Sequence, residues 1–320
     1  MDSKRIVITG ANGFIGANLC HHFSSRGHEL YAILRKDANM WRLDGIKENM
    51  HLIFISDFTT KSLTKMFQEI RPQVVLNTVG ADQKEFLTHP EGNWNSNFMT
   101  LVKLVNSLKD LAIERFIHAG SSFEYGNVSS SNNLLSEGIE CQPISEYAIS
   151  KLLQSEYLKL TSSLYNFKSV ILRIFNVFGP FESQNRLVPH VILNALKNEK
   201  ITIFNPTISR DFIYIDDVIN AFQKSIDFNG DLTHSIFNIG SGLGTSVSTI
   251  VDNVLKLTKS KSKINFVSGD NRPENSLPSP VADIALARKV LKWSPINSIN
   301  DALRKDITWF TQNRADYEIF

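Results

Sequence analysis

Apolar runs and amphipathic segments alternate along the first half of the chain. Short, largely apolar runs, typical of strands buried on both faces, occur at residues 6–8, 29–34, 51–55, 73–76, 115–119 and 168–173. Apolar residues at helical spacing follow the first run, recur over residues 61–70 and 97–111, and accompany residues 147–151. The alternation predicts an α/β fold of the Rossmann type, a doubly wound parallel sheet whose ligands bind at the carboxyl ends of the strands.

The pattern becomes less regular after residues 179–180. Helices are predicted over residues 188–197, 247–257, 282–291 and 299–310, and short strands over 211–215 and 235–238 enclose a further helix. We therefore expect a dinucleotide-binding Rossmann domain over residues 1–178, with contributions from about residues 211–240. A smaller α/β substrate-binding domain is expected over residues 179–320.

A glycine-rich turn joins the first predicted strand to the first predicted helix. Gly10, Gly13 and Gly16 stand at GxxGxxG spacing, and Phe14 and Ile15 open the helix between them. Such a turn directs backbone N–H groups and the positive end of the helix dipole at one point, which suits a pyrophosphate. Three glycines alone also fit an ordinary βα turn. The preceding strand and the following helix favour dinucleotide binding.

The residue that ends the second predicted strand bears on the choice of cofactor. In dinucleotide-binding folds an acidic residue at this place accepts from the 2′-hydroxyl of NAD, whereas an arginine suits the 2′-phosphate of NADP. Arg35 occupies this place, followed by Lys36. NADP(H) is therefore favoured, with NAD(H) possible, and the alternative for this pair is a solvated basic strand end.

Three residues could form a dehydrogenase site. Tyr147 and Lys151 are four residues apart in a predicted helix and project from one face, so the ammonium can lower the pKa of the phenol. Ser121 follows the fifth predicted strand, where its hydroxyl would face the same crevice. YxxxK also arises by chance, as a tyrosine and a lysine on a helix surface. The glycine turn and Ser121 favour an oxidoreductase.

Composition excludes some other classes of protein. The 320 residues are 42% hydrophobic and 21% charged with a net charge of +2, so neither nucleic acid nor a membrane is an expected partner. Cys20 and Cys141 match no metal or redox spacing, and no metal is expected. Cys20 should be a buried small hydrophobe. With a strand so close to Met1 that no signal peptide fits, the protein is expected in the cytoplasm.

Taken together, the motifs resemble the extended short-chain dehydrogenases/reductases, the NAD(P)-dependent nucleotide-sugar epimerases, dehydratases and 4-ketoreductases. The resemblance covers almost the whole chain, through residues 9–16, 120–126, 147–151, 172–180, 210–218, 272–273 and 292–295. It implies that the substrate is a nucleotide-diphosphate sugar. It also implies a homodimer formed by pairing the helix at 97–111 with the YxxxK helix, although the apolar stripe of 97–111 could equally be core.

The resemblance implies a role for each matching residue. Tyr147 would be the acid/base, Lys151 would bind the nicotinamide ribose and tune Tyr147, and Ser121 would hold the sugar 4-oxygen. Asp57 and Phe58 would flank the adenine. The substrate would be bound by Ser122, Asn176, Arg186, Arg210 and Arg272. Structural alternatives are domain-interface salt bridges for Arg210 and Arg272, a strand-end cap for Asn176 and a solvated helix start for Arg186.

Two departures narrow the expected chemistry. The 4,6-dehydratases carry an Asp-Glu pair after the catalytic serine or threonine, where this chain has Ser122 and Phe123. Glu124 is one residue away and is expected to be turned from the site. Enzymes that epimerise C3 and C5 use a cysteine and a histidine where this chain has Phe123 and Arg186. Dehydration and 3,5-epimerisation are therefore not expected.

Two reactions at C4 remain, and each needs only the cofactor and the three predicted catalytic residues. One is reduction of an NDP-4-keto-6-deoxyhexose by NADPH, as in deoxysugar biosynthesis, and the other is 4-epimerisation by retained NAD. Arg35 favours the reduction. So does the similarity of the stretches around Ser121, Arg186 and Arg210 to deoxysugar synthases. A non-catalytic NADP-binding protein is a third hypothesis, and the nucleotide, the sugar and the C4 stereochemistry stay open.

Overall fold

The fold was analysed in a computed structural model of the chain. It describes residues 3–81, 89–128, 134–165, 167–228, 230, 235–267 and 281–318. The chain forms two compact units and passes between them several times. The first unit comprises Met1–Gly126, Cys141–Arg173 and Ala221–Phe237, and the second comprises Asn127–Glu140, Ile174–Asn220 and Asn238–Phe320.

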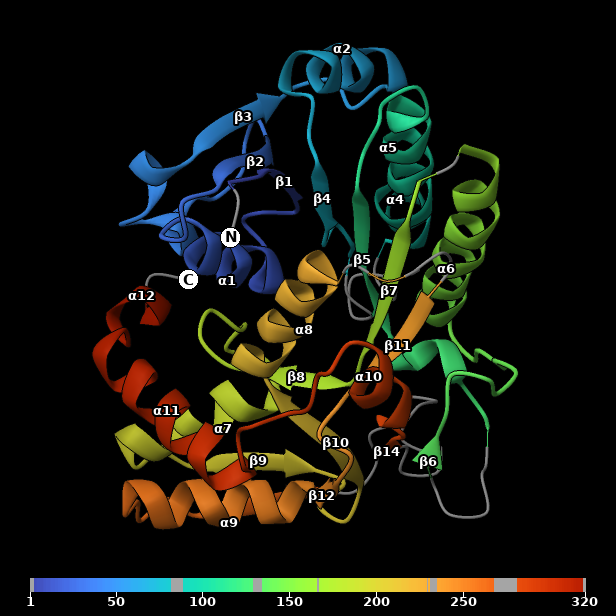
Figure 1. The fold of residues 1–320 in the computed structure, drawn as a ribbon. Coiled ribbons are helices and arrows are strands. Elements are labelled where there is room, and N and C mark those ends of the chain that lie inside the picture. Colours follow the sequence, from blue (N-terminus) through green and yellow to red (C-terminus); the bar gives the residue numbers. More distant parts are fainter. Residues whose placement is uncertain are drawn as a thin grey trace. The chain divides into compact units, whose positions relative to one another are not determined.

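A seven-stranded sheet organises the first unit. Its strand order is β11-β7-β5-β4-β1-β2-β3, and the chain therefore winds outward from β1 in both directions (Figure 1). The strands are β1 (Arg5–Thr9), β2 (Glu29–Arg35), β3 (His51–Ile55), β4 (Val74–Asn77), β5 (Arg115–Ser121), β7 (Ser169–Ile174) and β11 (Ser235–Ile239). The pairs β1–β2, β2–β3, β1–β4 and β4–β5 are parallel. The predicted doubly wound α/β fold is confirmed.

Helices flank this sheet (Figure 1). They are α1 (Phe14–Phe23), α2 (Thr60–Ile70), α4 (Pro90–Trp94), α5 (Thr100–Leu108), α6 (Glu146–Tyr165) and the end of α8 (Ile215–Asp227). Helix α5 contacts both α2 and α6. Side chains of these three helices and of the strands share one core, represented by Phe67, Leu104, Phe116, Leu158 and Ile171. Cys20 lies fully buried in α1, as predicted.

Two predicted helices needed correction. The segment predicted as helix 97–111 begins as a π-helical turn, Asn95–Met99, and α5 ends at Leu108. Its apolar stripe is mostly core, because Leu101, Leu104, Val105 and Leu108 are fully buried. The helix predicted from residue 282 begins only at Ala285, since Val281–Ala282 pairs with Leu134–Leu135 as a strand. A pairing partner nearly 150 residues away left no local signal.

The second unit is built from small sheets and helices. A three-stranded sheet has the order β12-β10-β8, β13 pairs with β9, and β14 pairs with β6. The strands are β6 (Leu134–Leu135), β8 (Asn176–Phe178), β9 (Ile201–Phe204), β10 (Ser209–Tyr214), β12 (Gly244–Ser246), β13 (Ile264–Val267) and β14 (Val281–Ala282). The helices are α7 (Leu187–Lys197), α9 (Val247–Thr258), α10 (Ala285–Val290), α11 (Ile299–Gln312) and α12 (Ala315–Glu318), with α8 beginning in this unit.

A buried carboxylate joins the segments of the second unit. Asp211 of β10 accepts hydrogen bonds from the backbone N–H groups of Ser241, Gly242 and Ala282, at 2.6, 3.0 and 3.0 Å. A carboxylate that binds several backbone donors is satisfied without a cation. Among the described residues, none of the helices combines the length and the apolarity that a bilayer crossing requires.

Candidate active site

The glycine turn after β1 has the geometry of a phosphate-binding loop. Gly10 adopts a φ of 72°, and a Cβ there would lie 2.9 Å from the backbone of Thr78. A Cβ on Gly16 would lie 2.1 Å from the carbonyl oxygen of Gly10, so the helix can approach the turn only without a side chain at this position. Gly13 is the N-cap of α1, and no described side chain caps the helix. The first backbone N–H groups of α1 are therefore suited to bind the pyrophosphate of a dinucleotide.

The residues predicted to hold the adenosine half of a cofactor lie at the carboxyl ends of two neighbouring strands, β2 and β3. Arg35 ends β2 and pairs with Ile55, which ends the neighbouring parallel strand β3. Asp57 and Phe58 follow β3 directly. Phe58 also packs against the core, and the Asp57 carboxylate accepts from Thr59 Oγ1 at 3.2 Å. The carboxyl ends of β2 and β3 thus carry one arginine and one carboxylate near the place that a cofactor ribose would occupy.

Ser121 is the last residue of β5, and its surroundings are polar but nearly closed. The side chain is 6% exposed, and its Oγ accepts from the backbone N–H of Phe123 at 3.2 Å. The next four residues, Ser122–Tyr125, form a single 3₁₀ turn. This turn reverses the chain at the carboxyl end of the strand. It presents Phe123 beside the predicted acid/base.

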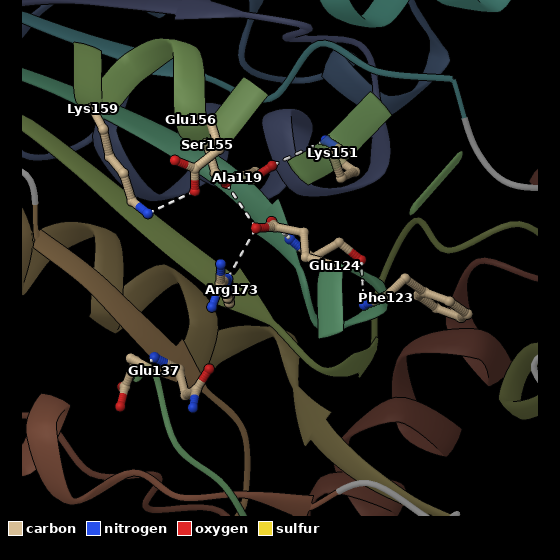
Figure 2. Close-up of polar contacts among 11 residues, drawn as sticks. Ala119, Phe123, Glu124, Glu137, Lys151, Ser155, Glu156, Lys159 and Arg173 are labelled. Carbon is tan, nitrogen blue, oxygen red and sulfur yellow. Dashed lines mark hydrogen bonds and ion pairs between the residues drawn. The ribbon is translucent and has the colours of Figure 1, made fainter. Parts of the chain in front are cut away.

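Helix α6 places Tyr147 and Lys151 against the same strand end. The Tyr147 ring meets the Phe123 ring edge-on, with centroids 5.8 Å apart. Lys151 Nζ donates to the backbone carbonyl of Ala119 on β5 at 3.0 Å (Figure 2). Both side chains of the YxxxK pair therefore converge on the segment that carries Ser121. The arrangement predicted for a proton-transferring trio is present within the first unit, while the catalytic role of the trio stays a prediction.

The environment of Lys151 changes its acidity. The side chain is 6% exposed, and burial lowers the pKa of Lys151 to about 8, while the negative charge of Glu124 opposes part of this shift. Burial also lowers the pKa of the neighbouring His118 well below its ordinary value, so this imidazole is neutral. A lysine that titrates near 8 can still be an ammonium at neutral pH. It can then stabilise a tyrosinate or take part in relaying its proton.

A further polar side chain near Lys151, Asn97, was not predicted from the sequence. It lies in the π-helical turn and is 1% exposed. Its Oδ1 accepts from the N–H of Ala81 at 2.6 Å, and its Nδ2 donates to Ser150 Oγ at 3.0 Å. These bonds join the segment after β4 to the helix that carries Lys151. The signal available was one asparagine in an otherwise apolar stripe, and π-helical turns often mark functional sites.

The predicted substrate residues other than Ser122 lie in the second unit or outside the described residues. Asn176 opens β8, and its Nδ2 donates to the backbone carbonyl of Asp211 on the paired strand β10 at 3.4 Å. Arg210 lies on β10, where its Nη1 donates to the carbonyl of Ser209. Arg186 is the exposed N-cap residue of α7. Arg272 lies outside the described residues, and substrate binding by all of these side chains stays a prediction.

Glu124 is turned away from the Tyr147 face, as expected. Its side chain is fully buried, and its carboxylate accepts from the backbone N–H of Ser121 and from the side chains of Ser155 and Arg173. Ser122 and Phe123 stand at the two positions where a dehydratase needs its acid pair. The first unit therefore offers no carboxylic acid at these two positions.

Comparisons with known proteins find relatives along nearly the whole chain. The profile of the NAD dependent epimerase/dehydratase family matches residues 6–240. The UDP-glucuronate 4-epimerase of Thermodesulfobacterium geofontis is 26% identical over 96% of this chain and 96% of its own. The dTDP-glucose 4,6-dehydratase of Neisseria gonorrhoeae is 22% identical over 98% of this chain and 97% of its own.

A solved structure extends the agreement to three dimensions. The UDP-glucuronic acid 4-epimerase of Bacillus cereus, in complex with UDP-glucuronic acid and NAD, superposes with a TM-score of 0.85 at 25% identity. The match covers 96% of this chain and 99% of the epimerase. The glycine turn, the strand order and the family profile lead to one conclusion: this chain belongs to the NAD dependent epimerase/dehydratase family.

Proposed function

We propose that this protein transfers hydride at C4 of a nucleotide-diphosphate sugar. The observation that carries the proposal is the convergence of Tyr147 and Lys151 on the strand end that carries Ser121. A nicotinamide, when bound, supplies or accepts the hydride. Tyr147 gives a proton to the sugar 4-oxygen or takes it away, and Ser121 holds that oxygen by a hydrogen bond. Lys151 favours the ionised phenol electrostatically and binds the ribose of the cofactor.

Reduction of an NDP-4-keto-6-deoxyhexose with NADPH is our first candidate reaction. A basic residue, Arg35, rather than a carboxylate ends β2, and a guanidinium suits the 2′-phosphate of NADP. In this reaction Tyr147 protonates the 4-oxygen as hydride reaches C4. The experiment measures NADPH absorbance with a panel of nucleotide-linked 4-keto-6-deoxy sugars, with NADH in parallel. Stoichiometric, sugar-dependent loss of NADPH supports the reductase.

A 4-epimerase with retained NAD is the second candidate. It is supported by the full-length similarity to UDP-glucuronate 4-epimerases and by the NAD in the Bacillus cereus complex. Its C4 chemistry would use the same three residues. Conversion of an intact nucleotide sugar into its C4 epimer without net oxidation, together with NAD released from the denatured protein, identifies this reaction. The cytoplasmic location expected from the sequence stays a prediction.

Changing Arg35 to aspartate is expected to reverse the cofactor preference. The substitution removes the cation that faces the 2′-phosphate and places a carboxylate where it can accept from a ribose 2′-hydroxyl. We expect kcat/KM for NADPH to fall about 100-fold and that for NADH to hold or rise. Steady-state kinetics with both cofactors measure the ratio.

The matched control for this substitution is Arg26→Asp. Arg26 is exposed and lies between the end of α1 and the start of β2. It therefore stands near the amino end of β2, whereas Arg35 stands at its carboxyl end. The substitution makes the same change of charge. Equal changes in the two variants would show that Arg35 acts only through net charge and would remove the support for NADP.

We propose that the protein is a homodimer formed through α6. Four apolar side chains on one face of this helix, Ile149, Leu153, Leu160 and Leu164, are 39, 40, 59 and 64% exposed. An apolar stripe of this length is unusual on a surface that meets only water. The matching stripe on α5 is mostly buried in the core, and this supports α6 as the interface of the proposed dimer.

Charges on the α6 stripe are expected to separate the protomers. We expect the double variant Leu160→Glu/Leu164→Glu to elute with half the molar mass of the wild type in light scattering coupled to size exclusion, since buried unpaired carboxylates oppose association. The control carries the same substitution at Leu243 and Ile296, which are 70 and 85% exposed in the second unit. A wild type that is monomeric at micromolar concentration would contradict the proposal.

A further inference from the structure

A buried carboxylate, Glu124, holds the backbone of the predicted catalytic serine. Its Oε1 accepts from the N–H of Ser121 at 2.8 Å, while Ser121 Oγ accepts from the N–H of Phe123 at 3.2 Å. The two bonds form a reciprocal capping box at the start of the 3₁₀ turn. Together they fix the direction in which Ser121 leaves β5.

The second oxygen of the same carboxylate binds two other elements. Oε2 accepts from Ser155 Oγ of α6 at 2.8 Å and from Arg173 Nε of β7 at 2.9 Å (Figure 2). Arg173 is 2% exposed, and its guanidinium stacks on the Tyr125 ring at 4.7 Å. One side chain thus links the end of β5, the YxxxK helix and β7 through charge-assisted bonds.

The strand is shaped to admit this carboxylate. A Cβ on Gly120 would lie 2.8 Å from Glu124 Oε1 and 3.0 Å from Ile171 Cγ2. Only glycine leaves room for the carboxylate to lie directly against β5. The glycine before the predicted catalytic serine is therefore explained by the position of Glu124, without any need to contact a ligand.

The same carboxylate acts on Lys151 through its charge. Lys151 is surrounded by the Ala119 carbonyl and His118 of β5, Gly80 after β4, and Asn97 of the π-helical turn. His118 is neutral, because its burial lowers its pKa. Among the described residues, Glu124 is the one acidic group whose charge favours the Lys151 ammonium. Arg173 pairs with the same carboxylate at 2.9 Å and neutralises part of its charge.

We propose that Glu124 is a positioning residue of the C4 oxidoreductase: its carboxylate fixes Ser121 at the strand end, two residues from the Ala119 carbonyl that binds Lys151. This inference rests on the proposed function. Glu124 touches no substrate in this scheme. It acts on Ser121 by one hydrogen bond to the backbone N–H and on Lys151 by electrostatics in a low-dielectric site.

The test compares pH profiles of the wild type and Glu124→Gln. The amide keeps the shape and can still accept from Ser121 N, but it removes the charge. We expect kcat to fall about tenfold to 100-fold with little change in substrate KM, because a small displacement at a catalytic group acts on the transition state. The pKa of the alkaline limb of kcat should fall by about one unit, because Lys151 then loses its proton at lower pH.

A second variant separates positioning from folding. In Glu124→Gln the buried guanidinium of Arg173 loses its counter-charge, which lowers the melting temperature. In the double variant Glu124→Gln/Arg173→Gln this guanidinium is also removed, so the melting temperature should recover toward that of the wild type. The alkaline limb should recover only in part, since the guanidinium charge is removed but no carboxylate favours the Lys151 ammonium. Full recovery of kcat together with the melting temperature would show that Glu124 acts only through stability.

A matched control lies on the same helix. Glu156 follows Ser155, is exposed, and pairs with Lys159 at 2.6 Å (Figure 2). Glu156→Gln makes the same chemical change away from the strand end and should leave kcat and the pH profile unchanged. A Glu124→Gln profile that superposes on that of an active wild type would overturn the inference. A wild type without turnover on any nucleotide sugar would instead overturn the proposed function.

Discussion

Replacing Tyr147 with phenylalanine is expected to lower kcat about 1,000-fold and to leave cofactor affinity within about twofold of the wild type. The phenol is the one group of the proposed site that delivers a proton to the sugar 4-oxygen. The ring contact with Phe123, at 5.8 Å between centroids, survives the substitution. Loss of the hydroxyl therefore removes proton transfer without reshaping the site. Steady-state turnover and NADPH fluorescence titration measure the two quantities.

Tyr157→Phe is the control for this experiment. Tyr157 lies on the same helix and accepts a hydrogen bond from Asn106 Nδ2 at 3.3 Å, in the packing between α5 and α6. Loss of its hydroxyl should affect stability slightly and turnover not at all. A Tyr147→Phe enzyme with a third or more of wild-type turnover would contradict the acid/base role. It would leave Lys151 as the remaining donor to examine.

Replacing Asp306 with asparagine is expected to stabilise the folded protein at pH 8 by about 1–3 kcal/mol, a rise of several degrees in melting temperature. Asp306 of α11 is fully buried, and neither carboxylate oxygen has a hydrogen-bond partner among the described residues. Burial, with a smaller contribution from Asp216, raises the pKa of Asp306 well above its ordinary value. Glu182, whose pKa is also raised by burial, feels the charge of Asp306 and gains from its removal.

The sign of the pH dependence follows from proton linkage. Because the folded-state pKa of Asp306 is raised, folding takes up a proton, and stability is lost as the pH rises from the ordinary value of 3.8 through the folded-state value. The advantage of asparagine should therefore be largest at pH 8 and shrink toward pH 5. Thermal melts across this range measure it. Asp252→Asn, at an exposed position of α9, should give no such trend, and an identical trend in both variants would contradict the assignment.

Local patterns were sufficient for much of the predicted fold. Strand and helix periods placed β1–β5 and β7 within one or two residues of their bounds, and also placed α1, α2, α6 and α7. In this part of the chain buried strands alternate with amphipathic helices. The spacing of their apolar residues can therefore be recognised in a short stretch of sequence. The short strands β6, β8, β9 and β12–β14 were missed. Each consists of two to four residues, and each is held by a partner distant in the chain rather than by its own propensity.

In the candidate site, too, some residues could be predicted from local sequence and others could not. Gly10, Ser121, Tyr147 and Lys151 could be found from the sequence, because a turn and an i, i+4 pair are local features with known chemistry. Asn97 could not be found, since its value depends on bonds to Ala81 and Ser150 across the fold. A helical stripe shows that a face is apolar, but not whether a second layer of the same chain covers it. For this reason the YxxxK helix was expected in a dimer interface only through the family resemblance, and the exposed stripe on α6 became visible only in the structure.

The sequence by itself determined the α/β class, the glycine turn and the residue types of the proposed oxidoreductase site. These follow from side-chain chemistry and from periods of two and 3.6 residues. Only the tertiary structure decided what Glu124 does. In the sequence it is a carboxylate one residue beyond the two positions at which the 4,6-dehydratases carry their acid pair. Folded, it is a buried anion bonded to Ser121, Ser155 and Arg173. The sequence shows that residue 124 carries a carboxylate. The effect of its charge depends on the local dielectric and on the partners that distant segments bring to it.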